Sequence, residues 1–150
     1  MSMSVTGFTQ RIVKCIDPSK IVFTAKMDSL TSMDQGVYIN IKTSIKNNSS
    51  DTLRYLSMSC SWAKYYQITS ATLHLPIPQC DNDSAILVSV LPHHSQKTIL
   101  RVISLMSPAQ LHNTRFKVRM TFVQACDIDK ASRELRRSKN LILSNTVLIK

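Results

Sequence analysis

The side chains most suited to chemistry in this sequence of 150 residues are four cysteines and four histidines. The cysteines are Cys15, Cys60, Cys80 and Cys126, and none has a second cysteine close by in the sequence. Structural zinc sites and dithiol redox sites usually need cysteine pairs at C-x-x-C spacing. The sequence therefore predicts neither kind of site, and it carries no local signature of a thiol nucleophile with a histidine base.

Two of the histidines, His93 and His94, are adjacent and follow Pro92. Adjacent side chains on an extended chain point to opposite sides, so we expect both to be exposed in a turn rather than to share a metal ion. The run 81–84 resembles the start of a calcium loop but lacks the glycine and the closing glutamate of an EF-hand. A turn built on aspartate side chains is the simpler interpretation.

Glycine is rare in this sequence, with Gly7 and Gly36 the only two. These two glycines are too few for a phosphate-binding loop, a dinucleotide-binding fingerprint or a nucleophile elbow, so the sequence contains none of these motifs. Glu134 is the only glutamate, and nothing places two carboxylates together as glycoside hydrolysis requires. We predict no catalytic residue, no metal site and no cofactor, and thus a protein that is not an enzyme.

Aromatic side chains gather at Trp62, Tyr65 and Tyr66, where they could form a platform for a sugar ring or a base. Trp62 continues the apolar alternation of a predicted strand, which favours a place in the core. Tyr65 and Tyr66 are the better surface candidates, although covering the edge of the core would suit them equally.

Lysine and arginine total 19 against 9 aspartates and glutamates, which gives a formal charge of +10. Such an excess favours anionic partners such as nucleic acid or acidic polysaccharide. The candidate contacts lie in two segments: Arg115, Lys117 and Arg119 on one strand face, and Arg133, Arg136, Arg137 and Lys139 on a predicted helix. The same residues could instead simply form the solvent-exposed faces of the strand and the helix. Both interpretations, polyanion contact and solvent exposure, stay open.

The elements that must position these residues are organised around 36–62, where two alternating runs flank a turn at 47–51. In the first run the inward set is Val37, Ile39, Ile41, Thr43 and Ile45. In the second it is Leu56, Met58, Cys60 and Trp62, and we expect Met58, Cys60 and Trp62 in the core. The two runs predict half-buried strands that pair as a long hairpin.

Further strands are predicted at 21–27, 68–75, 85–91, 97–105, 115–124 and 141–149. The strand at 97–105 is apolar on both faces, which is typical of a central strand. Along 115–124 the inward set is Phe116, Val118, Met120 and Phe122. The single predicted helix, 127–140, begins at Asp127 or Asp129 and turns Ala131 and Leu135 toward the body.

Eight or nine short strands with one short helix before the last strand indicate an all-β fold, a single antiparallel immunoglobulin-like β-sandwich over 20–150. A loose segment is expected over 1–19. No apolar run approaches the ~20 residues of a transmembrane helix, and no signal peptide is visible. The cysteines are either disulfide-bonded or buried as small apolar side chains.

The run Tyr55-Leu-Ser-Met-Ser-Cys-Ser-Trp62, preceded by Asn48-Ser-Ser-Asp-Thr52 and followed by Cys80-Asp-Asn-Asp83, resembles a group of small uncharacterised proteins of Bacteroidota. The similarity covers roughly 35–125. It implies an exported immunoglobulin-like β-sandwich, a periplasmic or surface setting and a Cys60–Cys80 disulfide, and it supplies no catalytic residue. The basic segment 127–140 lies outside the similar part.

Together these features predict a non-enzymatic binding or interaction module with a protein or glycan partner, exported to the periplasm or the cell exterior. The alternative is a basic protein that binds a polyanion, either nucleic acid or acidic polysaccharide.

Overall fold

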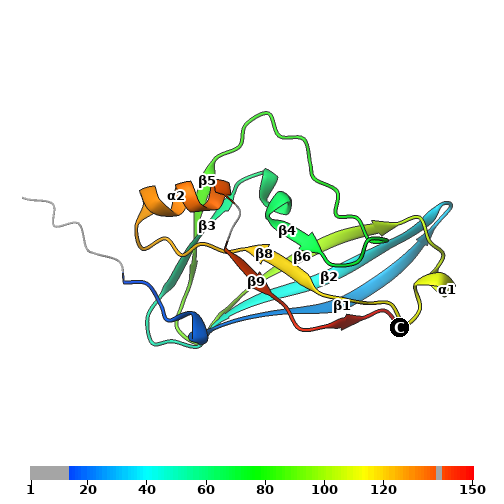
Figure 1. Cartoon of the computed structure of the whole chain (residues 1–150), viewed down its shortest axis with the longest axis horizontal. Coiled ribbons are helices and arrows are strands. Elements are labelled where there is room, and N and C mark those ends of the chain that lie inside the picture. The colour runs from blue at the N-terminus through cyan, green and yellow to red at the C-terminus, as the bar shows by residue number, and fades with distance from the viewer. Residues whose placement is uncertain (1–13, 138–139) are drawn as a thin grey trace, which may run out of the picture.

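The structure is a computed structural model and describes residues 14–137 and 140–150 (Figure 1). Its strands are β1 (Ile21–Met33), β2 (Gly36–Asn47), β3 (Leu53–Met58), β4 (Tyr66–Ile68), β5 (Ala85–Val90), β6 (Ser95–Ser104), β7 (Arg115–Phe116), β8 (Val118–Thr121), β9 (Leu141–Leu143) and β10 (Val147–Leu148). Its helices are α1 (Pro108–Leu111), α2 (Ile128–Arg137) and two 3₁₀ helices, η1 (Pro18–Lys20) and η2 (Ser61–Tyr65). The described chain is thus mostly β-structure, and all of its strand pairs are antiparallel.

The first layer is the sheet β1-β2-β6, with β2 in the centre. The alternation predicted for β2 is confirmed, because its inward set is buried: Val37, Ile39, Ile41, Thr43 and Ile45. The predicted hairpin with the run 53–62 is wrong, since β2 pairs with β1 and β6 instead. A two-residue turn joins β1 to β2, and Gly36 follows it at φ +117° where a Cβ would clash with the Ser104 carbonyl oxygen.

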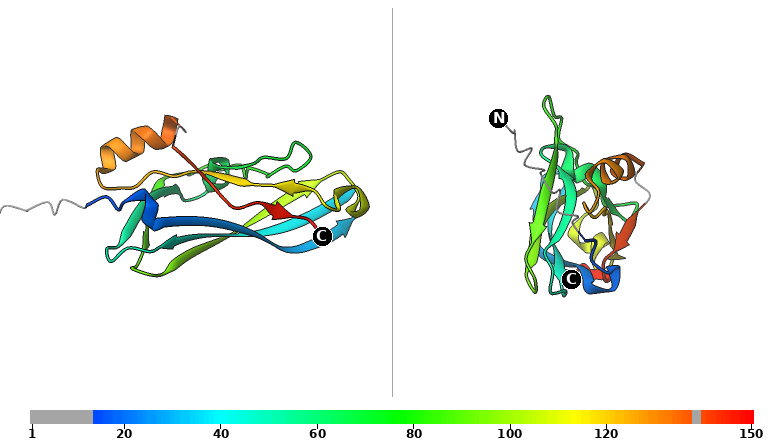
Figure 2. Two further views of the ribbon diagram at one scale, coloured as in Figure 1. Left: turned by 60° about the horizontal axis from the view of Figure 1, so that its bottom comes forward. Right: turned by 90° about the vertical axis from the view of Figure 1, so that its left-hand side faces the viewer.

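The second layer is the sheet β4-β8-β9, which β10–β7 extends at one end and β3–β5 at the other. The chain beyond β8 joins β3 through two backbone hydrogen bonds, Leu56 N to Val123 O at 3.2 Å and Ala125 N to Arg54 O at 2.8 Å. Figure 2 shows the two layers end-on, with α2 on the side of the molecule away from β1-β2-β6.

The main core fills the space between the layers, and the inward set predicted for 115–124 is buried in it: Phe116, Val118, Met120 and Phe122. The prediction for 53–62 is correct only in part. Met58 and Cys60 are half-buried, and Trp62 is half-buried at the core edge with its ring centroid 5.9 Å from that of Tyr66. The alternation stops at Met58 because a bend and η2 follow it.

A second, smaller apolar cluster lies on the outer side of the second layer, under α2. It contains Ala131 and Leu135, so the predicted inner face of the helix is confirmed. Leu56 packs here while its neighbour Tyr55 packs in the main core, so β3 is buried on both faces. The predicted alternation, with Leu56 inward, implies that Tyr55 points outward, and this is wrong because the second cluster receives Leu56 on the other face of β3.

Several predicted strands differ in the structure. The strand predicted at 115–124 is divided into β7 and β8 and ends at Thr121. The strand expected at 68–75 ends at Ile68, and only an isolated bridge from His74 to Ile103 follows. The strand at 97–105 is an edge of the first sheet rather than central, and Ile99 is 55% exposed on it. The last strand is broken between β9 and β10, where the Asn145 side-chain amide bonds both the N–H and the carbonyl of Ala25, at 2.8 and 3.1 Å.

All four cysteines are in disulfides, which decides between the two alternatives left by the sequence. Cys60 bonds Cys80 with Cα atoms 5.9 Å apart, the pair expected from the resemblance. Cys15 bonds Cys126 with Cα atoms 5.2 Å apart. Residues 14–19 belong to the segment expected to be loose, yet this bond and the burial of Ile16 attach them to the body.

The helix α1 was not predicted, although the sequence carries its signal. Ser107 is its N-cap and forms a capping box with Gln110, and Pro108 occupies the first helical position. With only four residues, the helix lacks the apolar periodicity by which α2 was found.

Candidate functional site

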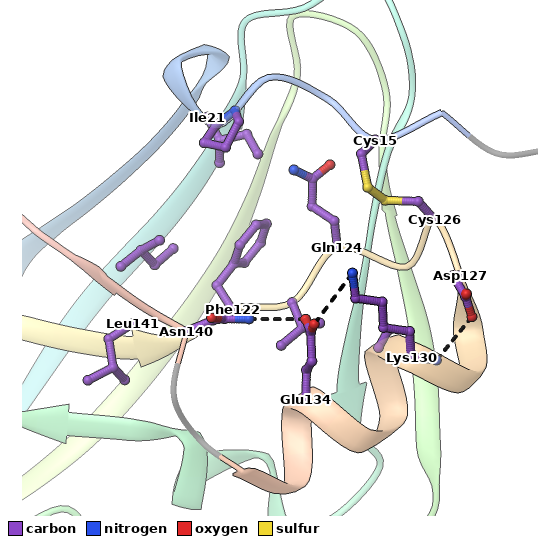
Figure 3. Close-up of a pocket in the computed structure, with 14 residues that line it drawn as sticks. Cys15, Ile21, Phe122, Gln124, Cys126, Asp127, Lys130, Glu134, Asn140 and Leu141 are labelled. Carbon is purple, nitrogen blue, oxygen red and sulfur yellow. Dashed lines mark hydrogen bonds and ion pairs between the residues drawn. A yellow bond between two sulfur atoms is a disulfide. The ribbon is translucent and has the colours of Figure 1, made fainter.

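A cleft of about 700 Å³ opens between α2, the chain that follows β8, and the residues around η1 (Figure 3). Three distant parts of the sequence form it: 15–21, 122–134 and 140–142. Its volume lies within the range of about 300–1,000 Å³ that is typical of ligand sites. We take it as the candidate functional site.

The floor of the cleft is apolar. Phe122 is buried, and Ile21 and Ile142 are half-buried beside it. Ala131 adds a small apolar wall from the inner side of α2, and Leu141 is 44% exposed at the opening. An apolar group that enters the cleft therefore meets side chains already held by the core, so little ordering cost opposes binding.

The rim on the α2 side is polar and carries both signs of charge. Lys130 Nζ lies 3.9 Å from Glu134 Oε1, and Asn140 Nδ2 donates to Glu134 Oε2 at 3.1 Å. Asp127 Oδ1 accepts from Lys130 N at 3.0 Å and so caps the helix, which decides between the two caps that the sequence allowed. Donors and acceptors thus stand together above an apolar floor.

The remaining wall holds the N-terminal segment in place. The Cys15–Cys126 disulfide forms part of it, and beside it the Gln124 side chain bonds the Ile16 backbone twice, at 2.8 and 2.7 Å. Sequence reasoning missed this disulfide because its cysteines are 111 residues apart. The pair could have been found by elimination, because a Cys60–Cys80 bond leaves only Cys15 and Cys126 among the four cysteines.

The lining of the cleft combines apolar side chains with charged and amide groups. The described side chains that line it include no histidine, serine, threonine or free thiol. Its carboxylates are engaged, Asp127 as the helix cap and Glu134 with Lys130 and Asn140. The arrangement can recognise an apolar group together with polar groups around it.

The basic residues predicted as polyanion contacts do not line this cleft. Arg133, Arg136 and Arg137 are exposed on α2, and Lys139 lies outside the described residues. On β7 and β8, Arg115 and Arg119 are exposed and Lys117 is half-buried. Within the described part of the chain, none of these six residues takes part in an ion pair.

The other side chains that the sequence indicated as candidates are either buried in the core or lie outside the cleft. Tyr65 and Tyr66 are buried, so of the two alternatives left open for them the structure shows a place in the core rather than a surface platform, and burial raises the pKa of Tyr66. His93 and His94 are exposed in the turn after Pro92, as predicted. Over 14–137 and 140–150, no group of three or more potential metal-binding side chains occurs.

The run 81–84 contains a carboxylate that holds a neighbouring loop. Asp83 accepts hydrogen bonds from Cys60 N at 3.1 Å, Ser61 N at 3.3 Å and the Ser61 hydroxyl. These bonds, led by that of the Ser61 hydroxyl and assisted by Lys64, lower the pKa of Asp83. The carboxylate thereby caps η2, whose own N-cap, Cys60, offers no side-chain bond.

Comparison with known proteins adds no relative: no protein-family model matches the chain, and no curated protein is similar to it in sequence. Among the described residues, no helix combines the length and the apolar character that crossing a bilayer requires.

Proposed function

We propose that this protein is a non-enzymatic interaction module that binds a peptide segment of a partner protein in the cleft beside α2. The observation that carries the proposal is the combination of an apolar floor, with Phe122 and Ile142, and a rim of both charges, with Lys130, Glu134 and Asn140.

A peptide suits this combination better than a uniformly apolar or uniformly charged ligand. The apolar floor can receive one or two apolar side chains of a partner. The amide of Asn140 and the charged groups of Lys130 and Glu134 can then bond the polar backbone of the same segment, which must keep its hydrogen bonds when it leaves water. The cleft is also open at the surface, so a segment can enter it without a change in the fold.

The wider setting of the proposal is an exported immunoglobulin-like sandwich. Two antiparallel layers enclosing one main core support that architecture. Export to the periplasm or the cell exterior is supported by two disulfides, since such bonds persist mainly in oxidising compartments.

Selection from a displayed library of random heptapeptides tests the proposal on the folded, oxidised protein. Asn140→Trp places a large side chain at the rim and should weaken the selected peptides at least tenfold. Arg136→Trp is the matched control, because it adds the same side chain to an exposed position of α2 outside the cleft. Affinities measured by fluorescence anisotropy should be unchanged for this control. Selected peptides that bind all three proteins equally would contradict the proposal.

A further inference from the structure

A strip of basic side chains crosses the outer face of the first layer. It consists of Lys26 on β1, Lys42 and Lys46 on β2, and Lys97 and Arg101 on β6, all five exposed. Their alternation with the buried sets of the same strands places them on the face that points away from the core.

The register of the sheet makes these five residues neighbours. Lys26 stands directly opposite Lys42. On the other side Lys42 faces Ile99, so Lys97 and Arg101 are its two diagonal neighbours, and Lys97 is also diagonal to Lys46, which faces Ser95. Direct partners in such a sheet are about 5 Å apart and diagonal ones about 7–8 Å apart. The cations therefore form a continuous zigzag, roughly 20 Å long for six residues of strand.

This arrangement is electrostatically unfavourable by itself. Like charges directly opposite each other destabilise a sheet, and Lys26 faces Lys42 in this way. One carboxylate relieves the strip: Asp28, placed by the register shift in β1, lies 2.6 Å from Lys42 Nζ. The other four cations form no ion pair among the described residues. An anionic ligand with several charges would relieve them together.

Exposed apolar side chains, Ile99 and Val22, lie between the cations, and hydroxyl groups and an aromatic ring that suit a sugar polymer lie beside them. Thr24 and Ser44 offer hydroxyl groups on the same face, opposite each other and next to Lys97. Tyr38 is 39% exposed near the end of the strip, and the Arg101 guanidinium carbon lies 5.7 Å from the centre of its ring. An exposed aromatic ring beside cations and hydroxyls can contact a sugar ring while the cations bind its acidic groups.

We propose that this strip binds a linear acidic polysaccharide that carries carboxylate or sulfate groups. The zigzag of cations runs about 20 Å along the strands, which fits an extended chain, and the two disulfides favour a compartment where nucleic acid is not the usual polyanion. The site is separate from the cleft, since α2 lies on the other side of the molecule (Figure 2). It also differs from the basic residues of α2 and β7–β8 that the sequence analysis selected.

The test compares two triple variants with the same loss of charge. Lys46→Gln, Lys97→Gln and Arg101→Gln together alter the strip, whereas Arg133→Gln, Arg136→Gln and Arg137→Gln together alter α2. Binding of labelled polygalacturonate and heparin fragments is measured by fluorescence anisotropy at low and moderate salt, with duplex DNA as a third probe. Thermal unfolding followed by circular dichroism shows whether each variant is folded.

We expect the strip variant to bind both polysaccharides about tenfold more weakly and with a smaller dependence on salt, because fewer counterions are released. The α2 variant should lose less than twofold. Equal losses in the two variants would overturn the proposal, because net charge alone would then explain binding. Wild-type protein that binds DNA more tightly than either polysaccharide would also overturn it. If the triple variant does not fold, Lys97→Gln alone should weaken polysaccharide binding by about twofold, and an unchanged affinity would count against the strip.

A second measurement separates sugar recognition from charge. Tyr38→Ala should weaken polygalacturonate binding about threefold and leave the binding of inorganic polyphosphate unchanged, because polyphosphate has no sugar ring. An equal effect on both probes would show that Tyr38 does not contact sugar, and the polysaccharide assignment would fall.

Discussion

The side chains of Asn47 and Asp83 both hold chain segments together through hydrogen bonds to backbone groups. They differ in burial, and this difference shows how burial changes the contribution of such bonds to stability. Asn47 ends β2 and is completely buried. Its amide donates to the carbonyls of Asp51, Val90 and Leu91 and accepts from the backbone and the hydroxyl of Ser49. It holds both connections between the sheets, from β2 to β3 and from β5 to β6.

Asp83 does similar work at the surface. It joins two segments more than twenty residues apart, with acceptor bonds to Cys60 and Ser61. Water can replace these bonds if they break, whereas the Asn47 side chain and its bond to the Val90 carbonyl are buried. A disulfide, Cys60–Cys80, reinforces the loop at Asp83, whereas no disulfide crosses the corner at Asn47. The buried corner should therefore be much more sensitive to substitution.

The largest effect is expected at the buried corner. Asn47→Ala leaves the buried carbonyl of Val90 and several part-buried backbone groups without their partner, at a cost of about 1–3 kcal/mol for a group that stays unpaired, so the free energy of unfolding should fall by about 3–4 kcal/mol. In a protein of this size the melting temperature should drop by roughly 10 °C. Asn48→Ala is the matched control, because Asn48 is exposed and only its backbone N–H is bonded, to Lys20 O. Urea unfolding that shows the same small change in both variants would contradict the comparison.

A slightly smaller effect is expected at the surface loop when its covalent link is removed. Cys60→Ser with Cys80→Ser opens a loop of 20 residues, and the lost constraint on the unfolded chain corresponds to about 3 kcal/mol. Urea unfolding at neutral pH measures this change, with the Cys15–Cys126 bond intact in both proteins. A loss well above that of Asn47→Ala would show that the loop, not the corner, is the critical connection.

The sequence predicted those parts of the fold that bury a single face. β2 is buried on one side only, so its alternation from Val37 to Ile45 was sufficient, and the same holds for Ala131 and Leu135 on α2. It failed at β3, where Tyr55 and Leu56 are adjacent and both buried. A strand between two apolar clusters has no simple alternation, and the second cluster exists only once α2 has packed.

Strand pairing and the two candidate sites could not be predicted from the sequence, because both depend on contacts between distant parts of the chain. The predicted inward set of 37–45 implies that Lys42 and Lys46 point outward, but their neighbours Lys97 and Arg101 come from β6, and β2 was expected to pair with the run that ends at Trp62 instead. The cleft likewise joins residues about 110 positions apart. Local periodicity reports which face a side chain occupies and is silent about which strand lies next to it.

The smallest effect in the comparison is a dependence on pH at Asp83. Its pKa is lowered below the ordinary value of 3.8, chiefly by the Ser61 hydroxyl bond. The carboxylate therefore stabilises the fold above about pH 4 and loses that contribution as the pH falls through its lowered pKa. Asp83→Asn should reduce stability slightly at pH 7, and its difference from wild type should shrink steadily below pH 4. Chemical unfolding of both proteins between pH 2.5 and pH 7 measures this window.

Asp17 provides the matched control for that measurement. Its pKa is lowered in the same direction, chiefly by the backbone N–H of Ser19, which it accepts at 2.9 Å. Because this bond joins residues two positions apart, it closes only a local turn, and Asp17→Asn should leave the loop at Cys60 unaffected. Amide hydrogen exchange at Cys60 and Ser61 should accelerate in Asp83→Asn and not in Asp17→Asn, since only the former replaces the charged acceptor of those two N–H groups with a neutral and weaker one. Equal protection in both variants would mean that the disulfide alone holds the loop, and the parallel between Asp83 and Asn47 would be lost.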